Sequence, residues 1–352
     1  MKVGLIGYGQ SGKSSLYQAA ASGGAKGEVT AVPVPDPRFD AIVKQVNPKK
    51  ITPATVLLHD SLDSAQGGTG KIFSQRMIDE ARKMDLLLHV VRGHDSPISP
   101  YFAAVDPIRD QEAIDVELVL ADLQIVENRL ERLQKSLTAK NPGSPDYIEK
   151  LVFDQLRGPL ETGVPIRAIE LDEDGQTIVR NYQFLSAKPM VVAFNVTEDQ
   201  VTAIPPNIST QIEKLKAIGT PAFVVCASLE QEVAQLDPAD QPEFLASIGL
   251  KEPAAHRVVQ AVYEALGLIT FYTAGENETR AWPLRRGSSA LKAAGTIHTD
   301  IAKGFIRAEV VSYADYEAHG SLDAAYSAGK MRLESKDYVI QDGDLLHIRN
   351  KV

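Results

Sequence analysis

The chain has 352 residues, of which 44% are hydrophobic and 24% are charged, and its formal net charge at pH 7 is −9. This length and composition predict a globular protein of two or three domains, and the acidic balance disfavours general affinity for nucleic acid, so no DNA partner is expected. No stretch reaches the roughly 18 apolar residues of a membrane helix, and the single cysteine excludes an intrachain disulfide, which together favour a cytoplasmic protein without membrane contact.

A phosphate-binding motif stands near the N-terminus. A short apolar strand over residues 2–6 leads into Gly7-Tyr-Gly-Gln-Ser-Gly12-Lys13-Ser14, which satisfies the pattern G-x-x-x-x-G-K-[ST], and a helix is predicted from Ser15 onward. In such a loop the backbone N–H groups and the helix N-terminus bind phosphate oxygens, the lysine reaches the β- and γ-phosphates, and the serine hydroxyl ligates Mg²⁺. We therefore predict a site for a purine nucleoside triphosphate with Mg²⁺, whose phosphate-binding residues are Gly7, Gly9, Gln10, Ser11, Gly12, Lys13, Ser14 and Ser15. A glycine-rich turn without a ligand is the alternative, which the flanking strand and helix disfavour.

Beyond this helix the pattern indicates a parallel α/β sheet. The glycine-rich segment 22–27 is a loop, the proline-rich segment 32–38 is extended, and residues 39–46 form a short helix. Four further apolar runs predict buried strands, at residues 55–60, 84–91, 189–195 and 221–226. Short apolar strands that alternate with helical patterns are typical of a parallel sheet with helices on both faces.

One segment departs from this alternation. Its apolar residues are spaced three and four apart, as in a heptad seam, at Val116, Val119, Leu123, Val126, Leu130, Leu133 and Leu137. After a loop at residues 140–145, a second apolar stripe with helical spacing comprises Ile148, Leu151, Val152, Leu156 and Leu160. Two helices joined in this way predict an antiparallel hairpin inserted between two strands of the sheet. The hairpin is either an arm that binds a partner or a pair that packs only on itself, and packing alone explains the seam.

The C-terminal residues predict a small mixed domain. Short strands are expected at residues 269–273, 278–282, 305–311 and 345–348. Eleven basic and eleven acidic residues lie between Thr270 and the end, so this part is neutral and the net charge resides in the rest of the chain. Contact with nucleic acid is therefore most plausible here, and the candidate basic face comprises Lys303, Arg307, Lys330 and Arg332. Ordinary solvated surface charges are the alternative.

Several motifs follow one another in an order typical of one family. They are the phosphate-binding loop, Val32-Pro-Val-Pro-Asp-Pro-Arg38, His89-Val-Val-Arg92, Glu117-Leu-Val-Leu-Ala-Asp-Leu123, Asn195-Val-Thr-Glu198, Phe271-Tyr-Thr-Ala-Gly275, Arg280-Ala-Trp282, Ile297-His-Thr-Asp300, Lys303-Gly-Phe-Ile-Arg307, Ala328-Gly-Lys-Met-Arg332 and Asp342-Gly-Asp344. In this series the chain resembles the YchF subfamily of Obg-like P-loop ATPases. The resemblance implies an α/β fold in three parts, namely a Ras-like P-loop NTPase sheet (residues 1–112 plus 181–267), an inserted antiparallel helical hairpin (113–180) and a C-terminal β-grasp TGS domain (268–352). It also implies hydrolysis of ATP and GTP and association with the ribosome or RNA, through the TGS domain and the hairpin.

The resemblance also assigns a base site and a metal site. Asn195-Val-Thr-Glu198 occupies the position of the N-K-x-D motif, whose aspartate accepts hydrogens from guanine in most GTPases. Here no lysine stem covers the base and the acid is one methylene longer, a pattern that accompanies loss of guanine selectivity and preference for ATP in the family. The implied base-binding residues are Asn195, Val196, Glu198 and Ser228, and the implied Mg²⁺ ligands are Ser14 and Asp60. Both ATP and GTP remain candidate ligands.

Three departures from the family pattern bear on catalysis. The first switch is shortened to residues 22–31, with Thr30 as its only threonine, and the loop over residues 64–71 is also short. The D-x-x-G motif is Asp60-Ser-Leu-Asp63, so that a carboxylate replaces the glycine whose N–H meets the γ-phosphate. The histidine that the family places after the His-Val-Val-Arg strand is out of register, with Tyr101 near its position and His94 before it. We therefore expect binding with slow or impaired hydrolysis; the alternative is a degenerate, non-hydrolysing paralogue that serves as a nucleotide-binding or nucleotide-free interaction scaffold.

Overall fold

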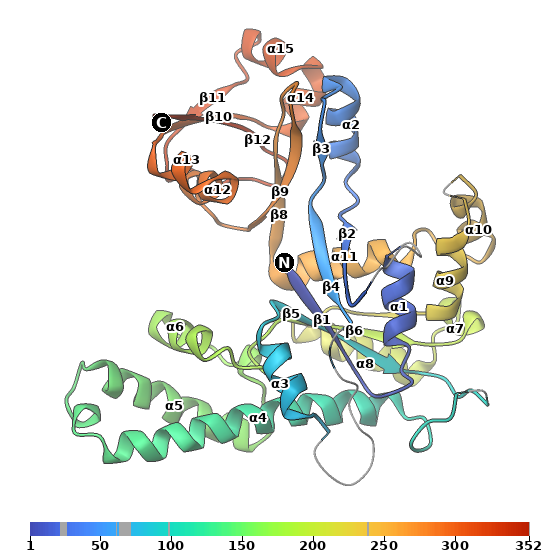
Figure 1. Ribbon diagram of the computed structural model, residues 1–352, viewed down its shortest axis with the longest axis vertical. Helices are drawn as coiled ribbons and strands as arrows, with labels where there is room; N and C mark the ends of the chain where they lie inside the picture. Colours follow the sequence, from blue (N-terminus) through green and yellow to red (C-terminus); the bar gives the residue numbers. More distant parts are fainter. Residues whose placement is uncertain (22–26, 61, 63–71, 98, 238, 352) are drawn as a thin grey trace. The chain divides into compact units, whose positions relative to one another are not determined.

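The computed structural model describes residues 1–21, 27–60, 62, 72–97, 99–237 and 239–351 (Figure 1). Contacts divide the chain into two compact units. The N-terminal unit comprises residues 1–31 and 57–261, and the C-terminal unit comprises residues 32–56 and 262–352. Among the described residues, no helix combines the length and the apolar character that crossing a membrane requires.

The N-terminal unit is built on a six-stranded sheet in the order β2-β4-β1-β5-β6-β7. Its strands are β1 (Lys2–Ile6), β2 (Val29–Pro33), β4 (Thr55–His59), β5 (Leu86–Arg92), β6 (Met190–Asn195) and β7 (Ala222–Val225). The pairs β1–β4, β1–β5, β5–β6 and β6–β7 are parallel, so the carboxyl ends of these strands lie at one edge of the sheet. β5 and β6 are buried along their whole length, as the continuous apolar runs of the sequence predict for a sheet covered on both faces.

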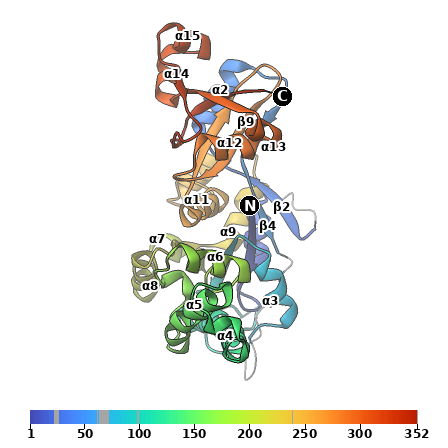
Figure 2. The same cartoon turned by 90° about the vertical axis from the view of Figure 1, so that its left-hand side faces the viewer.

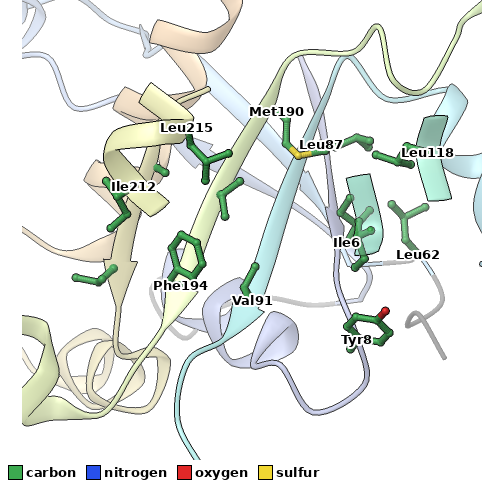
Figure 3. Packing of buried hydrophobic residues seen from close by; sticks show 14 of the residues in the cluster. Ile6, Tyr8, Leu62, Leu87, Val91, Leu118, Met190, Phe194, Ile212 and Leu215 are labelled. Atoms are coloured by element: carbon green, nitrogen blue, oxygen red, sulfur yellow. The ribbon is translucent and has the colours of Figure 1, made fainter. Parts of the chain in front are cut away.

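Helices of the N-terminal unit supply the apolar surfaces that this sheet requires. They are α1 (Lys13–Ala20), α3 (Gln75–Arg82), α7 (Glu198–Thr202), α8 (Pro206–Ala217), α9 (Ala227–Gln235), α10 (Gln241–Ser247) and α11 (Ala254–Leu266), the last of which extends beyond residue 261. In the largest core cluster, Phe194 of β6 lies beside Ile212 and Leu215 of α8, and Leu118 lies near Ile6 of β1 (Figure 3). The packing of α3, α8 and the hairpin root on one face of the sheet fixes the strand ends that carry the candidate site.

The predicted helical hairpin is present. It consists of α4 (Pro107–Lys135) and α5 (Pro145–Glu161), which lie side by side in both views (Figure 1, Figure 2). Asp106 caps α4 by accepting hydrogen bonds from two amides of its first turn, and Ser144 caps α5 in the same way with one. The hairpin core includes Val119, Val126, Leu130, Val152, Phe153, Leu156 and Leu160. The insertion also contains the 3-10 turns η1 (Thr138–Lys140) and η2 (Ile166–Ala168) and helix α6 (Glu173–Tyr182).

Three residues of the predicted apolar stripes are exposed instead of buried. The exposed fractions are 46% for Val116, 52% for Leu151 and 82% for Leu137. Leu137 lies beyond Lys135, where α4 ends, so the heptad pattern continues past the helix. The first turns of α4 pack against the sheet instead of α5, and there the buried positions include Leu118 and not Val116. A seam inferred for two helices alone therefore misplaces the residues at both ends of α4.

The C-terminal unit contains a second six-stranded sheet, in the order β11-β10-β12-β8-β9-β3. Its strands are β3 (Ile51–Thr52), β8 (Leu268–Thr273), β9 (Thr279–Arg285), β10 (Phe305–Val311), β11 (Arg332–Glu334) and β12 (Leu345–Asn350). The sheet is mixed, because β8–β9 and β10–β12 are antiparallel while β12–β8 is parallel. Its helices are α2 (Pro37–Val46), α12 (Ala290–Ile297), α13 (Thr299–Lys303), α14 (Tyr313–His319) and α15 (Leu322–Ser327). One face of the sheet packs against α12 and α13, and part of the other packs against α2, α14 and α15.

Residues 32–56 fall within the predicted sheet domain but group with the C-terminal unit. The segment contains α2, whose Phe39 packs with Tyr272 of β8, and β3, which extends the second sheet beside β9. The Tyr272 hydroxyl donates a hydrogen bond to Asp36, and Arg38 donates one to Asp342 at 2.9 Å. This part of the chain leaves the first sheet at β2 and returns to it at β4.

Candidate functional site

The loop between β1 and α1 has a backbone that favours glycine at two positions. Gly7 has a φ of 147° and Gly12 a φ of 97°. A Cβ atom on Gly7 would lie 2.3 Å from the carbonyl oxygen of Val90, and one on Gly12 would lie 2.2 Å from Asn195 Nδ2. Gln10 also has a positive φ, 64°, which a residue with a side chain adopts only at some energetic cost. The motif glycines allow the loop backbone to approach β5 and Asn195 this closely.

Side chains hold the carbonyl groups of this loop. Lys13 Nζ donates to the carbonyl oxygens of Gly7 and Tyr8, at 3.0 and 2.8 Å. Asn195 Nδ2 donates to the carbonyl oxygen of Ser11, at 3.0 Å. The C=O and N–H of one peptide group point in opposite directions, so each held carbonyl also fixes the direction of the N–H that follows it. A loop of N–H groups fixed in this way is the kind of backbone nest that binds phosphate oxygens.

Lys13 and Asp60 affect each other's protonation. Burial lowers the pKa of Lys13 to about 8, and the charge of Asp60 opposes that shift. Burial raises the pKa of Asp60, while a hydrogen bond from the Ser14 side chain and the charge of Lys13 act in the opposite direction. The hydroxyl of Ser14 and the carboxylate of Asp60 therefore meet beside the loop, where β4 ends.

These two oxygen donors fit Mg²⁺. Hydroxyl and carboxylate oxygens are ligands that Mg²⁺ prefers, and in nucleotide sites the ion takes one or two of them and completes its shell with phosphates and water. Within the described part of the chain, no group of three or more His, Cys, Asp or Glu side chains is arranged to hold a metal. Ser14 and Asp60 thus suit an ion that arrives with a nucleotide and do not suit a permanently held structural metal.

The predicted base-binding residues lie after two neighbouring strands. Asn195 ends β6, and its side chain accepts a hydrogen bond from the Ala227 amide at 3.0 Å, so that it joins the loop to the start of α9. Val196 is fully buried, its side chain belongs to the core and its N–H donates to the carbonyl oxygen of Val225 at 2.8 Å, so the structure gives no support to its predicted contact with the base. Glu198 and Ser228 are exposed in the first turns of α7 and α9. Both positions are open to solvent, and the Ser228 hydroxyl lies 3.3 Å from the thiol sulfur of Cys226.

The two residues considered for the family's histidine position already have hydrogen-bonding partners. His94 Nδ1 lies 3.1 Å from the carbonyl oxygen of Asn195, beside the base motif. The Tyr101 hydroxyl donates to Asp110 at 2.8 Å. Burial and then this hydrogen bond raise the pKa of Tyr101 well above its ordinary value, so the phenol stays neutral. Tyr101 therefore anchors its loop to α4 and does not act as a base near neutral pH.

Comparison with known proteins decides the family. Residues 268–351 match the family YchF-GTPase_C, described as a protein of unknown function (DUF933). The ribosome-binding ATPase YchF of Bacillus subtilis (strain 168) is 36% identical over 100% of this chain and 100% of its own length. The protein of the same name from Haemophilus influenzae is 36% identical over 100% of this chain and 99% of its own. The chain belongs to the YchF family.

Solved structures agree with this assignment. The YchF GTPase of Schizosaccharomyces pombe superimposes with a TM-score of 0.88 over 99% of this chain and 97% of its own, at 28% identity. A GTP-binding protein from Pyrococcus horikoshii OT3, 19% identical, shares the fold over the whole length of both chains with a TM-score of 0.63. The family resemblance and the α/β fold class predicted from the sequence are therefore confirmed.

Sequence reasoning missed the structural environment of two residues in the YchF-family motif His89-Val-Val-Arg92. The Arg92 guanidinium is buried and donates to the carbonyl oxygens of Gln10, at 3.2 Å, and of Ser99, at 2.7 Å. His89 is buried in the same strand, and neither of its ring nitrogens has a hydrogen-bond partner in the described structure. Burial lowers the pKa of His89 to about 3, so the ring is neutral. The sequence does show an arginine at the end of an apolar strand. By itself this pattern only marks the family and does not predict the contacts of Arg92.

Some of the expected departures from the YchF pattern lie outside the described residues. They are Asp63, the loop 64–71 and residues 22–26 of the shortened first switch. Thr30, the single threonine of that switch, belongs to β2 and is half-buried. The predictions that rest on Asp63 and on the short loops stay predictions, as do the roles assigned to the individual nucleotide-binding residues.

Proposed function

We propose that this chain binds a purine nucleoside triphosphate, ATP or GTP, together with Mg²⁺, hydrolyses it slowly and acts on ribosome-associated partners in the cytoplasm. The observation that carries this proposal is that side chains hold the loop carbonyls of Gly7, Tyr8 and Ser11 in place. This arrangement directs the loop N–H groups at an anion, with Lys13 and the start of α1 beside them. Relatives named ribosome-binding ATPases match the whole chain, which supports the same class of activity here.

In the proposed complex each residue of the site has one task. The loop backbone binds the phosphate oxygens, and Lys13 supplies a positive charge to the β- and γ-phosphates. Ser14 and Asp60 hold Mg²⁺, which when bound neutralises charge on the phosphate oxygens. Asn195 keeps the loop and α9 together, and Glu198 and Ser228 meet the base. The exposed acid of Glu198, in place of the aspartate of N-K-x-D, supports a preference for ATP over GTP.

The proposed hydrolysis is slow because the two residues considered for the family's histidine position are already engaged in hydrogen bonds. His94 Nδ1 lies 3.1 Å from the carbonyl oxygen of Asn195, the Tyr101 hydroxyl donates to Asp110, and His89 is buried. In-line attack at the γ-phosphoryl needs a positioned water and charge stabilisation as well as binding. The second candidate, a nucleotide-binding scaffold that does not hydrolyse its ligand, follows from the same observation if turnover is undetectable.

The proposed contact with ribosomal RNA uses the C-terminal sheet. Three of the four basic residues predicted for this role pair with carboxylates of their own unit, namely Lys303 with Asp300, Lys330 with Asp315 and Arg332 with Glu334. Arg307 instead lies directly opposite Arg349 on β12, and like charges placed opposite one another destabilise a sheet. Glu309 pairs with Arg349, whereas no described carboxylate forms an ion pair with Arg307. The negative charge of an RNA phosphate backbone would relieve the repulsion between Arg307 and Arg349. This supports the sheet face that carries these two arginines as the RNA contact.

The hairpin offers a second contact of a different kind. Leu137 is 82% exposed and lies where the chain turns from α4 towards α5. A large apolar side chain this exposed at the end of an arm gains free energy when a partner covers it. Its exposure supports the interpretation of the hairpin as an arm that binds a partner, and not as a pair that packs only on itself.

The deciding experiment is calorimetry with ATP, GTP and their non-hydrolysable analogues, run beside a phosphate-release assay and co-sedimentation with ribosomes. We expect Mg²⁺-dependent binding of a triphosphate, release of phosphate far slower than binding, and co-sedimentation that weakens in salt. A chain that binds neither triphosphate would contradict the nucleotide part of the proposal. Co-sedimentation that is unchanged by Arg307→Glu, with Lys336→Glu as the charge-matched control on the same unit, would contradict the RNA contact.

A further inference from the structure

Arg92 makes an unusual set of contacts for a buried arginine. It is the last residue of β5 and is 1% exposed. Its Nε donates to the carbonyl oxygen of His94 at 2.9 Å, Nη2 to that of Ser99 at 2.7 Å, and Nη1 to that of Gln10 at 3.2 Å. Nη1 also lies 3.4 Å from the Ser99 hydroxyl. One guanidinium thus joins the phosphate-binding loop to the loop that follows β5.

No described carboxylate forms an ion pair with Arg92. A buried charge is normally paired, because removing it from water without a counter-charge is costly. Among the described residues, Arg92 donates to the oxygens of three carbonyl groups and one hydroxyl, and its Cζ atom lies 5.0 Å from the centre of the Tyr101 ring. Arg92 therefore places a fixed positive charge beside the phosphate-binding loop, to which it is joined by one direct hydrogen bond.

The contact with Gln10 falls at the strained position of that loop. Gln10 has a φ of 64°, and both its backbone and its side chain are held, because Ser99 Oγ donates to Gln10 Oε1 at 2.6 Å. Lys13 holds the carbonyls on the N-terminal side of Gln10, and Asn195 holds the next one. The peptide group between Gln10 and Ser11 is held on both sides, because Arg92 donates to its carbonyl oxygen and the Ser11 N–H donates to the carbonyl oxygen of Tyr8 at 3.3 Å. Its rotation would move an N–H group of the phosphate site.

We propose that Arg92 is a positioning residue of the nucleotide site, which holds the Gln10 carbonyl so that the loop N–H groups stay directed at the phosphates. This inference rests on the proposed nucleotide binding. Arg92 does not touch the ligand; it acts through the backbone of the loop and through the positive charge that it keeps next to it. The same fork also holds His94 and Ser99 of the following loop, and Tyr101 near the end of that loop donates to Asp110 of α4. The phosphate-binding loop is therefore held from the root of the hairpin as well as from its own strand.

The test compares Arg92→Lys with a matched control, Arg257→Lys. Lysine keeps the charge but cannot span the three carbonyls that the fork of arginine joins. Arg257 belongs to the same unit and also donates to a backbone carbonyl, that of Val224 at 2.7 Å, while it pairs with Glu230. Binding of ATP, ADP and inorganic pyrophosphate is measured by calorimetry, and hydrogen–deuterium exchange is followed in the peptide that carries residues 7–16. Thermal unfolding is recorded for every variant.

We expect Arg92→Lys to lower the affinity for all three ligands by about tenfold, which is the scale of a hydrogen bond to a charged group. We also expect faster hydrogen–deuterium exchange in the loop. Because the loop is shared by diphosphate and triphosphate, the loss is the same for each ligand. Arg257→Lys lowers the unfolding temperature and leaves affinity and loop exchange at the wild-type level. Equal losses of affinity in both variants, or affinity of Arg92→Lys within twofold of wild type, would overturn the inference.

Two further outcomes keep the inference separate from the proposed function. A wild-type chain that binds none of the three ligands overturns both, whereas normal wild-type binding with an unaffected Arg92→Lys overturns only the role of Arg92. If Arg92→Lys does not fold, Ser99→Ala takes its place, because it removes one hydroxyl at the partly exposed end of the fork. We expect Ser99→Ala to lower the affinity for pyrophosphate by about threefold, in the range of a single neutral hydrogen bond, while the unfolding temperature stays unchanged. Unchanged affinity would then count against the proposed positioning of Gln10 by the residues that hold it.

Discussion

The hydroxyl of Tyr272 donates a hydrogen bond to the carboxylate of Asp36, and it ties the segment between β2 and β4 to the C-terminal sheet. Asp36 also accepts from Arg38, which in turn donates to Asp342, so four side chains form one polar network inside the unit. Burial and then the bond to Asp36 raise the pKa of Tyr272, which keeps the phenol neutral and available as a donor. The segment is therefore held by specific polar contacts in addition to the apolar packing of α2.

Tyr272→Phe is predicted to destabilise the C-terminal unit by about 1–2 kcal/mol, because Asp36 loses one donor while the ring keeps its packing. The chain has a single tryptophan, Trp282, which lies in β9 of this unit, so its fluorescence follows unfolding of this unit in urea. Tyr326→Phe is the matched control, since Tyr326 is 65% exposed. An unchanged urea midpoint in Tyr272→Phe, or an equal shift in the control, would show that the network contributes nothing to stability.

The sequence predicted the parts of this molecule that local patterns encode. The loop from Gly7 to Ser14 is defined by residue types at fixed spacing, and the buried strands are defined by continuous apolar runs. The hairpin followed from helical spacing, but Val116, Leu137 and Leu151 of its predicted apolar stripes are exposed; Val116 was misplaced because the sheet and not α5 covers the first turns of α4. The attachment of residues 32–56 to the C-terminal unit was not predictable in this way. It depends on pairs such as Asp36 and Tyr272, which are far apart in the chain and show no local pattern.

Side-chain roles in the site were predictable only where one residue type has one established task. Lys13 and Ser14 begin α1, directly after the loop, and their roles towards phosphate and Mg²⁺ stay predictions. Asn195 was assigned to the base, yet its amide also joins the loop to α9, because an amide is both donor and acceptor. Arg92 gave no sequence signal for its contacts, since an arginine at the end of a strand is usually solvated. Its burial follows from the path of the next loop, which no spacing rule describes.

Base selectivity is predicted to be weak or to favour adenine. Full conversion of residues 195–198 to N-K-x-D is not the useful test, because Val196 is buried and a lysine there would bring a charge into the core. Glu198→Asp changes an exposed side chain and restores the length of the acid that accepts from guanine. We expect it to raise the affinity for GTP relative to ATP severalfold in a competition titration, while Asp199→Glu, its exposed neighbour, changes nothing. A wild-type preference for GTP of about a hundredfold, which is several kcal/mol, would contradict this assignment of the base site.

Lowering the pH is predicted to reduce the stability of the N-terminal unit because His89 is buried in its neutral form. In the folded state the pKa of the ring is about 3, so the ring is neutral. In the unfolded chain its pKa has the ordinary value of 6.5, so the ring becomes protonated when the pH falls below 6.5. Stability is therefore lost as pH falls from 6.5 towards 3, and the loss at pH 5 is about 2 kcal/mol. His89→Leu is expected to remove this part of the pH dependence, and to be neutral or stabilising at pH 7, because both ring nitrogens lack partners in the described structure.

The measurement for His89→Leu is urea unfolding followed by circular dichroism at pH 7 and pH 5. His256→Gln is the control, since its side chain is 42% exposed in the same unit. The control should keep the wild-type difference between the two pH values. If the difference is the same in wild type and His89→Leu, the ring takes up its proton without unfolding and the prediction is wrong.

Turnover is predicted to be slower than in relatives with an intact D-x-x-G motif. Asp63 places a carboxylate where that motif has glycine, and like charges a few ångströms apart repel unless one is protonated. Asp63→Gly is expected to tighten triphosphate binding but to restore little hydrolysis, because the first switch remains short. Phosphate release is compared in wild type and variant under saturating ATP. A wild-type rate equal to that of an intact family member would show that some other group positions the water.

Nucleotide affinity is predicted to fall as pH rises through 8. Burial lowers the pKa of Lys13 to about 8 from its ordinary value of 10.5, so between these values the free protein loses a charge that the unfolded chain keeps. The stability of the free protein therefore increases over this range, whereas affinity for phosphate falls with the charged fraction of Lys13. That fraction drops from about 90% at pH 7 to about 10% at pH 9, which corresponds to roughly tenfold weaker binding. These opposite trends separate loss of the lysine charge from general unfolding at high pH.

Calorimetry at pH 8 in two buffers with different ionisation enthalpies measures the proton that Lys13 takes up when the triphosphate binds. We expect net uptake, because the phosphates stabilise the charged amine and raise its pKa. Lys13→Ala should lose about 2 kcal/mol of binding free energy at pH 7 and show neither the proton uptake nor the fall in affinity between pH 7 and pH 9. Affinity that is flat across this range in wild type would mean that Lys13 stays charged despite its burial. Unchanged affinity in Lys13→Ala would remove the phosphate-binding role of the loop itself.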